Sequence, residues 1–363
     1  MNLHRLPLIE CVNILDSERI PITASDRIAG PYPYYGANGI QDWVDDYIFD
    51  DELVLLAEDG GNFGSADKPI AYRVSGKCWV NNHAHVLKPK NGINADYLCY
   101  SLMHYDTSKI ISGSTRAKLT QSALKKISVP IADDQTQSII VSRLNTVGHL
   151  SNQCSLALTK LNNVIKSRFV EMFGNLTNND KGWSFVELAS VCDVRDGTHD
   201  SPKYCEDGYP LMTSKNFSQG FADFSSAKFI SKDDFDAINK RSKVDVGDIV
   251  MPMIGTIGHP VIVDTNRLFA IKNVALLKMH NAGINRTVLK CLLESDYFSQ
   301  VVESHNHGAT QRFISLNNIR GLEIPVIPIC LQQEFADFVS QVDKLRFEAC
   351  YAMYLLCAAF TLL

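Results

Sequence analysis

Two long apolar repeats constrain this chain more than any other feature of its sequence. Between Pro130 and Gly174 there is no proline, and apolar or small residues recur three or four positions apart. They are Leu144, Val147, Ser151, Cys154, Leu158, Leu161, Ile165 and Met172, with Arg168 in the one polar slot. This spacing is typical of a helix that packs along one face, as in a coiled coil. We therefore expect one helix of roughly 60 Å that begins near Asp134 and ends near Gly174.

A second repeat with the same spacing lies at the C-terminal end of the sequence. Its members are Val342, Leu345, Ala349, Ala352, Leu356, Ala359 and Leu363. Two matched helices in one chain favour packing of one helix against the other. The apolar stretch 350–363 is shorter than the ~20 residues that a membrane span needs. We therefore expect a helix that buries one face against a protein partner, and no membrane partner.

Length and charge indicate a globular protein of more than one domain. The chain has 363 residues, which predicts two domains or slightly more. A net charge of −5 argues against a chain covered by nucleic acid but allows local basic patches. Ten cysteines occur without a C-x-x-C pair, which argues against zinc-site spacing. With no signal-peptide pattern at the start, we expect a cytoplasmic protein with reduced thiols.

Landmarks of the first part of the chain recur in order in the second part. Segment 247–251 matches 51–55, the Asn273-Val274 pair matches Asn82-His83, and segment 308–311 matches 113–116. A tandem duplication explains this order. The expected division is a first globular region at 1–133, a central long helix acting as a spacer at 134–176, a second globular region at 177–331 and a C-terminal long helix at 332–363.

Local composition predicts the elements of the first region. Tyrosines, prolines and glycines at 31–39 favour a loop. Segments 47–49 and 53–56 favour strands on either side of an acidic turn, and 79–87 favours one strand. Residues 96–105 favour a helix.

Motifs for catalysis are missing from the sequence. Gly76-Lys77 lacks the first glycine and the following hydroxyl of a phosphate-binding loop. There is no Asn-Pro-Pro or Asp-Pro-Pro tetrad for base methylation and no G-x-G-x-x-G after a strand. The pairs His83/His85 and His305/His307 lack a third ligand, so surface or DNA-facing histidines explain them better than a metal site.

The segment 108–132 carries a local positive charge. It contains no acidic residue, and its basic residues are Lys109, Arg116, Lys118, Lys125 and Lys126. A solvated surface is the simplest explanation of such a run. Near the glycine-containing segment 113–116, the same residues can instead approach a phosphate backbone.

The ordered motifs resemble those of the specificity (S) subunits of Type I restriction-modification systems. The first half contributes segments 33–39, 53–60, Asn82-His83, 113–116, 129–131 and Gln135. The second half contributes 196–199, 255–258, 273–275, 308–311 and Gln332-Gln333. Together these motifs cover nearly the whole chain.

This resemblance implies an α+β fold with two target-recognition domains, separated by two long helices that form an antiparallel coiled coil. Each domain would read one half of a bipartite, asymmetric duplex DNA site. Two modification (methyltransferase) subunits would dock on the helices, and restriction (motor-nuclease) subunits would join them. S-adenosylmethionine, ATP and Mg would belong to those partners, with no cofactor, metal or catalysis in this chain.

The candidate DNA contacts lie in the loops that differ between the two regions and in the motifs around them. Tyrosine, asparagine, histidine and lysine there can reach base edges or phosphates. The Tyr34-Tyr35 pair has core packing as its alternative reading. The candidates are Tyr34, Tyr35, Gly36, Asn38, Asn82, His83, Ser114, Thr115, Arg116, Lys118, Thr198, His199, Lys215, Asn216, Thr256, Asn273, Thr310, Gln311 and Arg312.

Other classes of function remain open at this point. The same module could serve another methylation or phage-defence system. A nuclease with an unrecognised motif and a coiled-coil scaffold for protein partners without DNA are further alternatives. Salt-dependent binding to duplex DNA separates a DNA reader from a scaffold.

Overall fold

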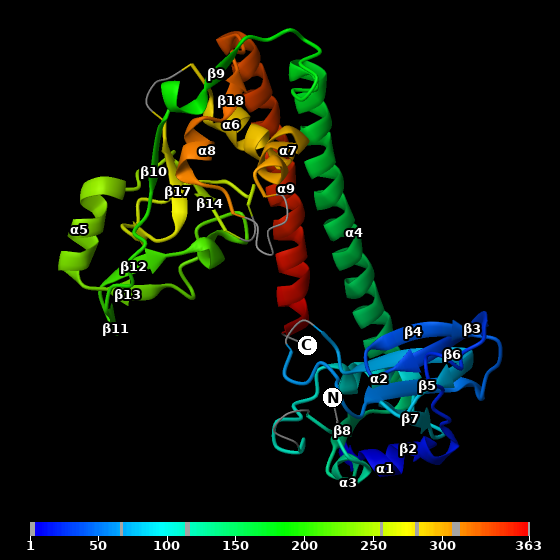
Figure 1. Ribbon diagram of the computed structural model, residues 1–363. Helices are drawn as coiled ribbons and strands as arrows, with labels where there is room; N and C mark the ends of the chain where they lie inside the picture. Colours follow the sequence, from blue (N-terminus) through cyan, green and yellow to red (C-terminus); the bar gives the residue numbers. More distant parts are fainter. Residues whose placement is uncertain are drawn as a thin grey trace. The chain divides into compact units, whose positions relative to one another are not determined.

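The computed structural model describes residues 4–65, 68–112, 117–254, 257–279, 283–306 and 313–361. The chain divides into two compact units, Met1–Ser151 and Asn152–Leu363. The boundary falls inside the long helix α4 (Asp134–Phe173). The presence of α4 confirms the helix predicted from the apolar repeat. Both units combine strands with helices, as the ribbon in Figure 1 shows.

A six-stranded sheet forms the centre of the first unit. The strands lie in the order β2-β7-β5-β6-β3-β4, and a separate pair, β1 and β8, is antiparallel. The strand bounds are β1 His4–Pro7, β2 Val12–Ile14, β3 Ala29–Gly36, β4 Gly39–Val44, β5 Phe49–Ala57, β6 Ala71–Val80, β7 Ala84–Pro89 and β8 Ser128–Ile131. The helices before α4 are α1 Leu8–Cys11, η1 Asp16–Glu18, α2 Ala95–Met103 and α3 Gln121–Leu124.

Strand β5 is buried on both faces of this sheet. Val54 and Leu56 pack in one apolar cluster with residues of α2, while Leu53 and Leu55 pack in another. Successive side chains of a strand point to opposite faces. A central strand covered on both sides therefore has a continuous apolar sequence, as β5 has from Leu53 to Ala57.

Two four-stranded sheets form the centre of the second unit, in the orders β10-β17-β14-β15 and β11-β13-β12-β16. The strands are β9 Phe185–Glu187, β10 Asp193–Asp196, β11 Tyr204–Cys205, β12 Tyr209–Met212, β13 Lys228–Ile230, β14 Ile249–Pro252, β15 Val261–Ile262, β16 Ala270–Ile271, β17 Val274–Lys278 and β18 Glu323–Pro325. The helices are η2 Leu188–Ser190, η3 Ser214–Phe217, α5 Lys232–Ser242, α6 Arg286–Leu293, α7 Asp296–Ser304, α8 Leu316–Arg320 and α9 Ile329–Thr361.

The strand connections of the two units follow one plan. In the first unit β7 lies between β2 and β5, and β3 runs parallel to β6. In the second unit β17 lies between β10 and β14, and β12 runs parallel to β16. A short antiparallel pair precedes each long helix, β1–β8 before α4 and β9–β18 before α9. The strand pairing thus repeats, as the ordered sequence landmarks predicted.

Three phenylalanines join α4 to α9 within the second unit. Phe335 is fully buried, and its ring lies 5.6 Å from the Phe169 ring and 5.2 Å from the Phe173 ring, between centroids. At the rim, Arg168 donates to Glu334 at 2.8 Å. The last turns of α4 therefore lie against the first turns of α9, and the helices run antiparallel where they meet (Figure 1). Aromatic burial supplies most of this contact, since exposed ion pairs contribute little.

The predicted packing face is confirmed along α4 but is partly wrong along α9. Every predicted α4 position is at least partly covered, and Ile165 is buried. On α9, Val342 is buried as predicted, but Leu345 is 53% exposed and Ala352 is also exposed. Ala349 is partly covered, as predicted, and the other partly covered positions here are Arg346 and Met353. The side chains of Leu356, Ala359 and Leu363 lie outside the described part of the chain.

Three local predictions for the first region are wrong, and one is confirmed. Residues 31–39 form the end of β3, a turn and the start of β4, because tyrosines fit strands well. The acidic pair at 50–51 lies inside β5, where Asp51 accepts from Lys88 of β7 at 2.6 Å. Residues 79–87 belong to two strands, β6 and β7, separated by a turn. The helix expected at 96–105 is present as α2.

Within the described residues, none of the helices combines the length and the apolar character that crossing a bilayer requires.

The Phe169, Phe173 and Phe335 cluster generates a stability prediction. Replacing Phe335 with alanine should lower the free energy of unfolding by about 3–5 kcal/mol, because a fully buried ring leaves a cavity. Urea denaturation followed by circular dichroism measures the change. Phe347→Ala is the matched control, since Phe347 is 71% exposed on the same helix, and it should change stability by about 0.5 kcal/mol or less. Equal losses in both variants would contradict this packing.

Candidate nucleic-acid interface

Polar segments of the first unit meet around the turn between β3 and β4. Asn38 is exposed in this turn, and its Nδ2 donates to the carbonyl of Gly60 at 3.0 Å. The Gly36 carbonyl accepts from the Tyr72 hydroxyl of β6. Gly39 has a φ of +109°, a conformation that favours glycine. The turn is therefore held from two sides and presents Asn38 at the surface.

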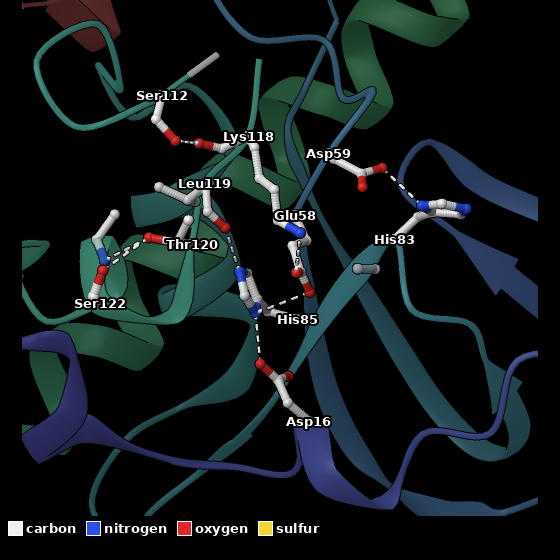
Figure 2. A network of polar contacts seen from close by, with 12 residues as sticks. Asp16, Glu58, Asp59, His83, His85, Ser112, Lys118, Leu119, Thr120 and Ser122 are labelled. Carbon is white, nitrogen blue, oxygen red and sulfur yellow. Dashed lines mark hydrogen bonds and ion pairs between the residues drawn. The ribbon is translucent and has the colours of Figure 1, made fainter. Parts of the chain in front are cut away.

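The turn between β6 and β7 lies against the segment that follows β5. The Nδ1 of His83 lies 2.7 Å from Asp59 Oδ1 (Figure 2). The carbonyl of His83 accepts from the N–H of Glu58 at 2.9 Å. Asn82, next to His83, is exposed. These contacts place Asn82 and His83 beside the segment that also holds Asn38.

Lys118 reaches the same segment from a different part of the chain. Its backbone forms antiparallel bridges with Asp59 and with Ser112. Its Nζ lies 3.2 Å from Glu58 Oε1, and almost half of its side chain is exposed. The structure thus brings together four of the predicted DNA contacts, which are Asn38, Asn82, His83 and Lys118.

A buried histidine supports this surface. His85 is 1% exposed, with Nδ1 at 2.6 Å from Asp16 Oδ2 and Nε2 at 2.7 Å from the Leu119 carbonyl oxygen (Figure 2). Burial raises the pKa of Asp16, but hydrogen bonds from His85 and Val86 and the charge of Arg19 lower it overall, so this carboxylate is ionised. Both ring nitrogens then face acceptors. These two contacts fix the orientation of the ring.

Two cations complete the cluster around His85. Arg19 donates to Glu58 Oε2 at 2.8 Å, and Lys118 meets the other oxygen of Glu58. The ligand atoms of Asp16, Glu58 and His85 lie within 4.8 Å of one another, a spacing that could hold a metal ion. All four carboxylate oxygens already have protein donors. An ion would have to displace Arg19 and Lys118 and break the His85 contact, so the arrangement is best explained as an ion-pair network.

Three predicted contact residues meet in the second unit. The His199 Nδ1 lies 2.9 Å from Asn273 Oδ1, and its Nε2 lies 2.9 Å from Asp196 Oδ2. The Thr198 carbonyl accepts from the Asn273 N–H at 3.1 Å. Asn273 has a φ of +54°, a left-handed conformation that asparagine tolerates. Thr198, His199 and Asn273 therefore share one surface.

A cavity of about 330 Å³ lies beside this group. Asp196 is mostly buried there and pairs with Arg241 of α5. The cavity is lined by Asp196, Thr198, Asp200, Ser201 and Arg241, among others. The lining also includes Asp234, and its one guanidinium already pairs with Asp196, so the hollow suits a hydrogen-bond donor such as the amino group of a base edge better than a phosphate.

Two predicted contacts have internal roles. Tyr34 is 1% exposed, and its hydroxyl accepts from the Ile22 N–H at 3.0 Å. Asn216 is also buried, with Oδ1 accepting from the Thr213 N–H at 2.9 Å and Nδ2 donating to the Asp223 carbonyl at 3.1 Å. Direct DNA contact by Tyr34 or Asn216 does not fit this burial, because the fold already uses their polar atoms.

The remaining candidates differ in exposure. Tyr35 is half-buried, with its ring centroid 5.7 Å from that of Tyr72. Gly36 is buried, whereas Lys215 is exposed in η3. The other predicted contacts lie outside the described residues, and they are Ser114, Thr115, Arg116, Thr256, Thr310, Gln311 and Arg312.

Sequence reasoning missed Asp16 and Arg241 and did not recognise the role of His85. Asp16 and His85 are 69 positions apart, so no local spacing marks them as a pair. One feature of the sequence could have marked the two acidic residues. Asp16 lies just beyond the end of β2, and Asp196 lies at the end of β10.

Comparisons with known proteins match the two halves of the chain to one family model. A family model described as "Type I restriction modification DNA specificity domain" matches residues 7–165 and again 180–349. A Haemophilus influenzae protein provisionally named a type I restriction enzyme specificity subunit is 29% identical over 353 residues, which cover 93% of this chain and 87% of that protein. The Escherichia coli "Type I restriction enzyme EcoprrI specificity subunit" is 26% identical over 121 residues, which cover 33% of this chain and 29% of that protein.

A solved structure shares the fold. The crystal structure of the Type I restriction-modification S subunit from M. genitalium superposes with a TM-score of 0.60 at 13% identity. The match covers 99% of this chain and 94% of that chain.

The His85 network generates a second stability prediction. His85→Leu removes the buried contacts of the ring to Asp16 and to the Leu119 carbonyl, so the free energy of unfolding should fall by about 3–5 kcal/mol. Chemical denaturation at neutral pH measures the loss. His83→Ala is the control, because the His83 side chain is 36% exposed, and its loss should stay below about 1 kcal/mol. Similar denaturation midpoints for His85→Leu and the parent would contradict this structural role of His85.

Proposed function

Because the chain belongs to the Type I restriction modification DNA specificity family and is the non-catalytic specificity subunit of such a system, we propose that it reads a bipartite, asymmetric duplex site. The first globular region, within residues 1–133, takes one half of the site. The second region, within 177–331, takes the other half. The two long helices set the separation between the halves.

The observation that carries this proposal is one strand plan with two different polar surfaces. The paired strands repeat between the units, which supports a repeated way of meeting DNA. Apart from the matched Asn82 and Asn273, the polar side chains of the two surfaces do not repeat, which supports different half-sequences. The first surface has Asn38, Asn82, His83 and Lys118, and the second has Thr198, His199, Lys215 and Asn273.

The chemistry of these residues fits base and phosphate recognition. Asparagine amides can pair with an adenine edge, and lysine can serve guanine or phosphate. In the basic segment 108–132, we propose Arg116 and Lys118 as phosphate or base-edge contacts of the first region. Arg312 is the proposed counterpart in the second. Phosphate contacts position the protein, and base contacts give specificity.

We further propose that the long helices carry the partner subunits. Two modification subunits would supply S-adenosylmethionine chemistry, and restriction subunits would supply the ATP- and Mg-dependent steps, in the cytoplasm. Exposed apolar side chains support docking on these helices. Leu156 and Val164 of α4 and Phe347 and Tyr351 of α9 have side chains that are 46–71% exposed. Exposed apolar surface of this kind is typical of a protein-interaction site.

A domain exchange tests the bipartite function. Residues 1–133 are replaced by the matching region of a relative with a different target, and 134–363 are kept. Methylation mapping of host DNA should show one half of the recognised sequence changed, with the other half and the spacer retained. Replacement of 177–331 is the reciprocal control and should change the opposite half. If both halves change in either chimaera, the two regions are not independent readers.

A lysine substitution tests the proposed second surface. Lys215→Ala in the assembled complex should weaken binding to all duplex sequences and flatten the slope of log affinity against log salt by about one, as expected for a lost phosphate contact. Lys240→Ala is the matched control, because Lys240 is an exposed lysine on α5 of the same unit. An unchanged slope for Lys215→Ala would remove Lys215 from the interface.

A further inference from the structure

A buried glutamine ties the start of α4 to the first globular region. Gln137 is fully buried within the first two turns of the helix. Its Nε2 donates to the carbonyls of Gly92 at 2.9 Å and Ala132 at 2.8 Å. Its Oε1 accepts from the N–H of Asn94 at 2.8 Å. Asn94 is also the N-cap of α2, whose side chain accepts from two backbone N–H groups. One side chain therefore connects α4, the end of β8 and the start of α2.

The same contacts occur at the start of α9. Gln332 is 1% exposed, and its Nε2 donates to the carbonyls of Gly283 at 2.8 Å and Ile327 at 2.7 Å. Its Oε1 accepts from the N–H of Asn285 at 2.6 Å, and Asn285 is the N-cap of α6. The two glutamines thus make three equivalent backbone hydrogen bonds in the two halves of the duplication.

Few side chains can make this set of bonds. The carboxamide carries two N–H donors and one carbonyl acceptor in a single plane. Glutamate has no donor for the two carbonyls, and leucine has neither donor nor acceptor. Because both glutamine side chains are buried, leaving one of these hydrogen bonds unmade would cost free energy of folding. Because hydrogen bonds are directional, the three together restrict how the helix can tilt on its globular region.

We propose that Gln137 and Gln332 are positioning residues that set the spacer length accepted between the two half-sites. The inference rests on the bipartite function proposed above. Helix α4 has 40 residues and extends roughly 60 Å. A rotation of about 5° at its start moves its far end by about 5 Å, which exceeds the ~3.4 Å rise of one base pair. A small loss of angular restraint at the glutamine is therefore enough to admit a neighbouring spacer length.

The test measures spacer selectivity and not overall activity. The assembled complex, carrying its modification subunits, methylates a DNA library with the mapped half-sites fixed and the spacer varied by one base pair in each direction. For Gln137→Leu and Gln332→Leu, the preference for the parental spacer should fall about tenfold, which corresponds to about 1.4 kcal/mol. The base sequence of both halves should not change. Gln135→Leu and Gln333→Leu are matched controls, because these glutamines are exposed on the same turns, and they should keep the parental preference.

Two outcomes separate the possible failures. If the leucine variants methylate more slowly with unchanged spacer preference, the glutamines serve stability alone and this proposal is overturned. If the parental complex itself shows no spacer dependence, the bipartite function fails first. Thermal melting checks that each variant is folded. Where a leucine variant does not fold, Gln137→Asn or Gln332→Asn replaces it, since asparagine keeps the amide but shortens its reach. The preference for the parental spacer is then measured in the same way.

Discussion

The buried carboxamide at the start of each long helix is the constraint on which the geometry of the molecule depends. Apolar burial holds the pieces together, but it is non-directional, so a helix can tilt on an apolar contact at little cost. The hydrogen bonds of Gln137 and Gln332 are directional and are costly to leave unmade. The apolar cores therefore hold each long helix against its globular region, and the glutamines fix the angle between the helix and that region.

The long helices could be predicted from sequence because their apolar repeat is sustained over many turns. The covered face of α9 could not. A seven-residue repeat specifies one face only when the other faces are polar, and α9 also carries Phe347, Tyr351 and Leu355 on its exposed side. Arg346 is partly covered although it is charged, since an arginine can bury its aliphatic stem. The strands were harder to predict, because polar residues inside β5 and β6 look like turns when read locally.

The candidate site was predictable as a set of segments but not atom by atom. Loops far apart in sequence do meet, as Asn38 and His83 show. Whether another predicted residue can contact DNA depends on how deeply its side chain is buried. A turn whose own backbone needs partners takes them from nearby polar side chains, and Asn216 is used in this way. A pair such as Asp16 and His85 leaves no local trace in the sequence. Gln135 and Gln137 likewise differ only in which side of one helical turn faces the protein.

The partners of the two glutamines explain how such a molecule can change its target without losing its geometry. Within the described part of the chain, each glutamine hydrogen-bonds to backbone groups of its neighbours, such as the Gly92 carbonyl and the Asn94 N–H. Backbone groups persist through most substitutions, so the direction of the helix does not depend on which side chains occupy the reading loops. Those loops can then differ as widely as the surfaces around His83 and His199 do. A frame set by backbone hydrogen bonds and a surface set by side chains are physically separable, and a duplicated reader needs that separation.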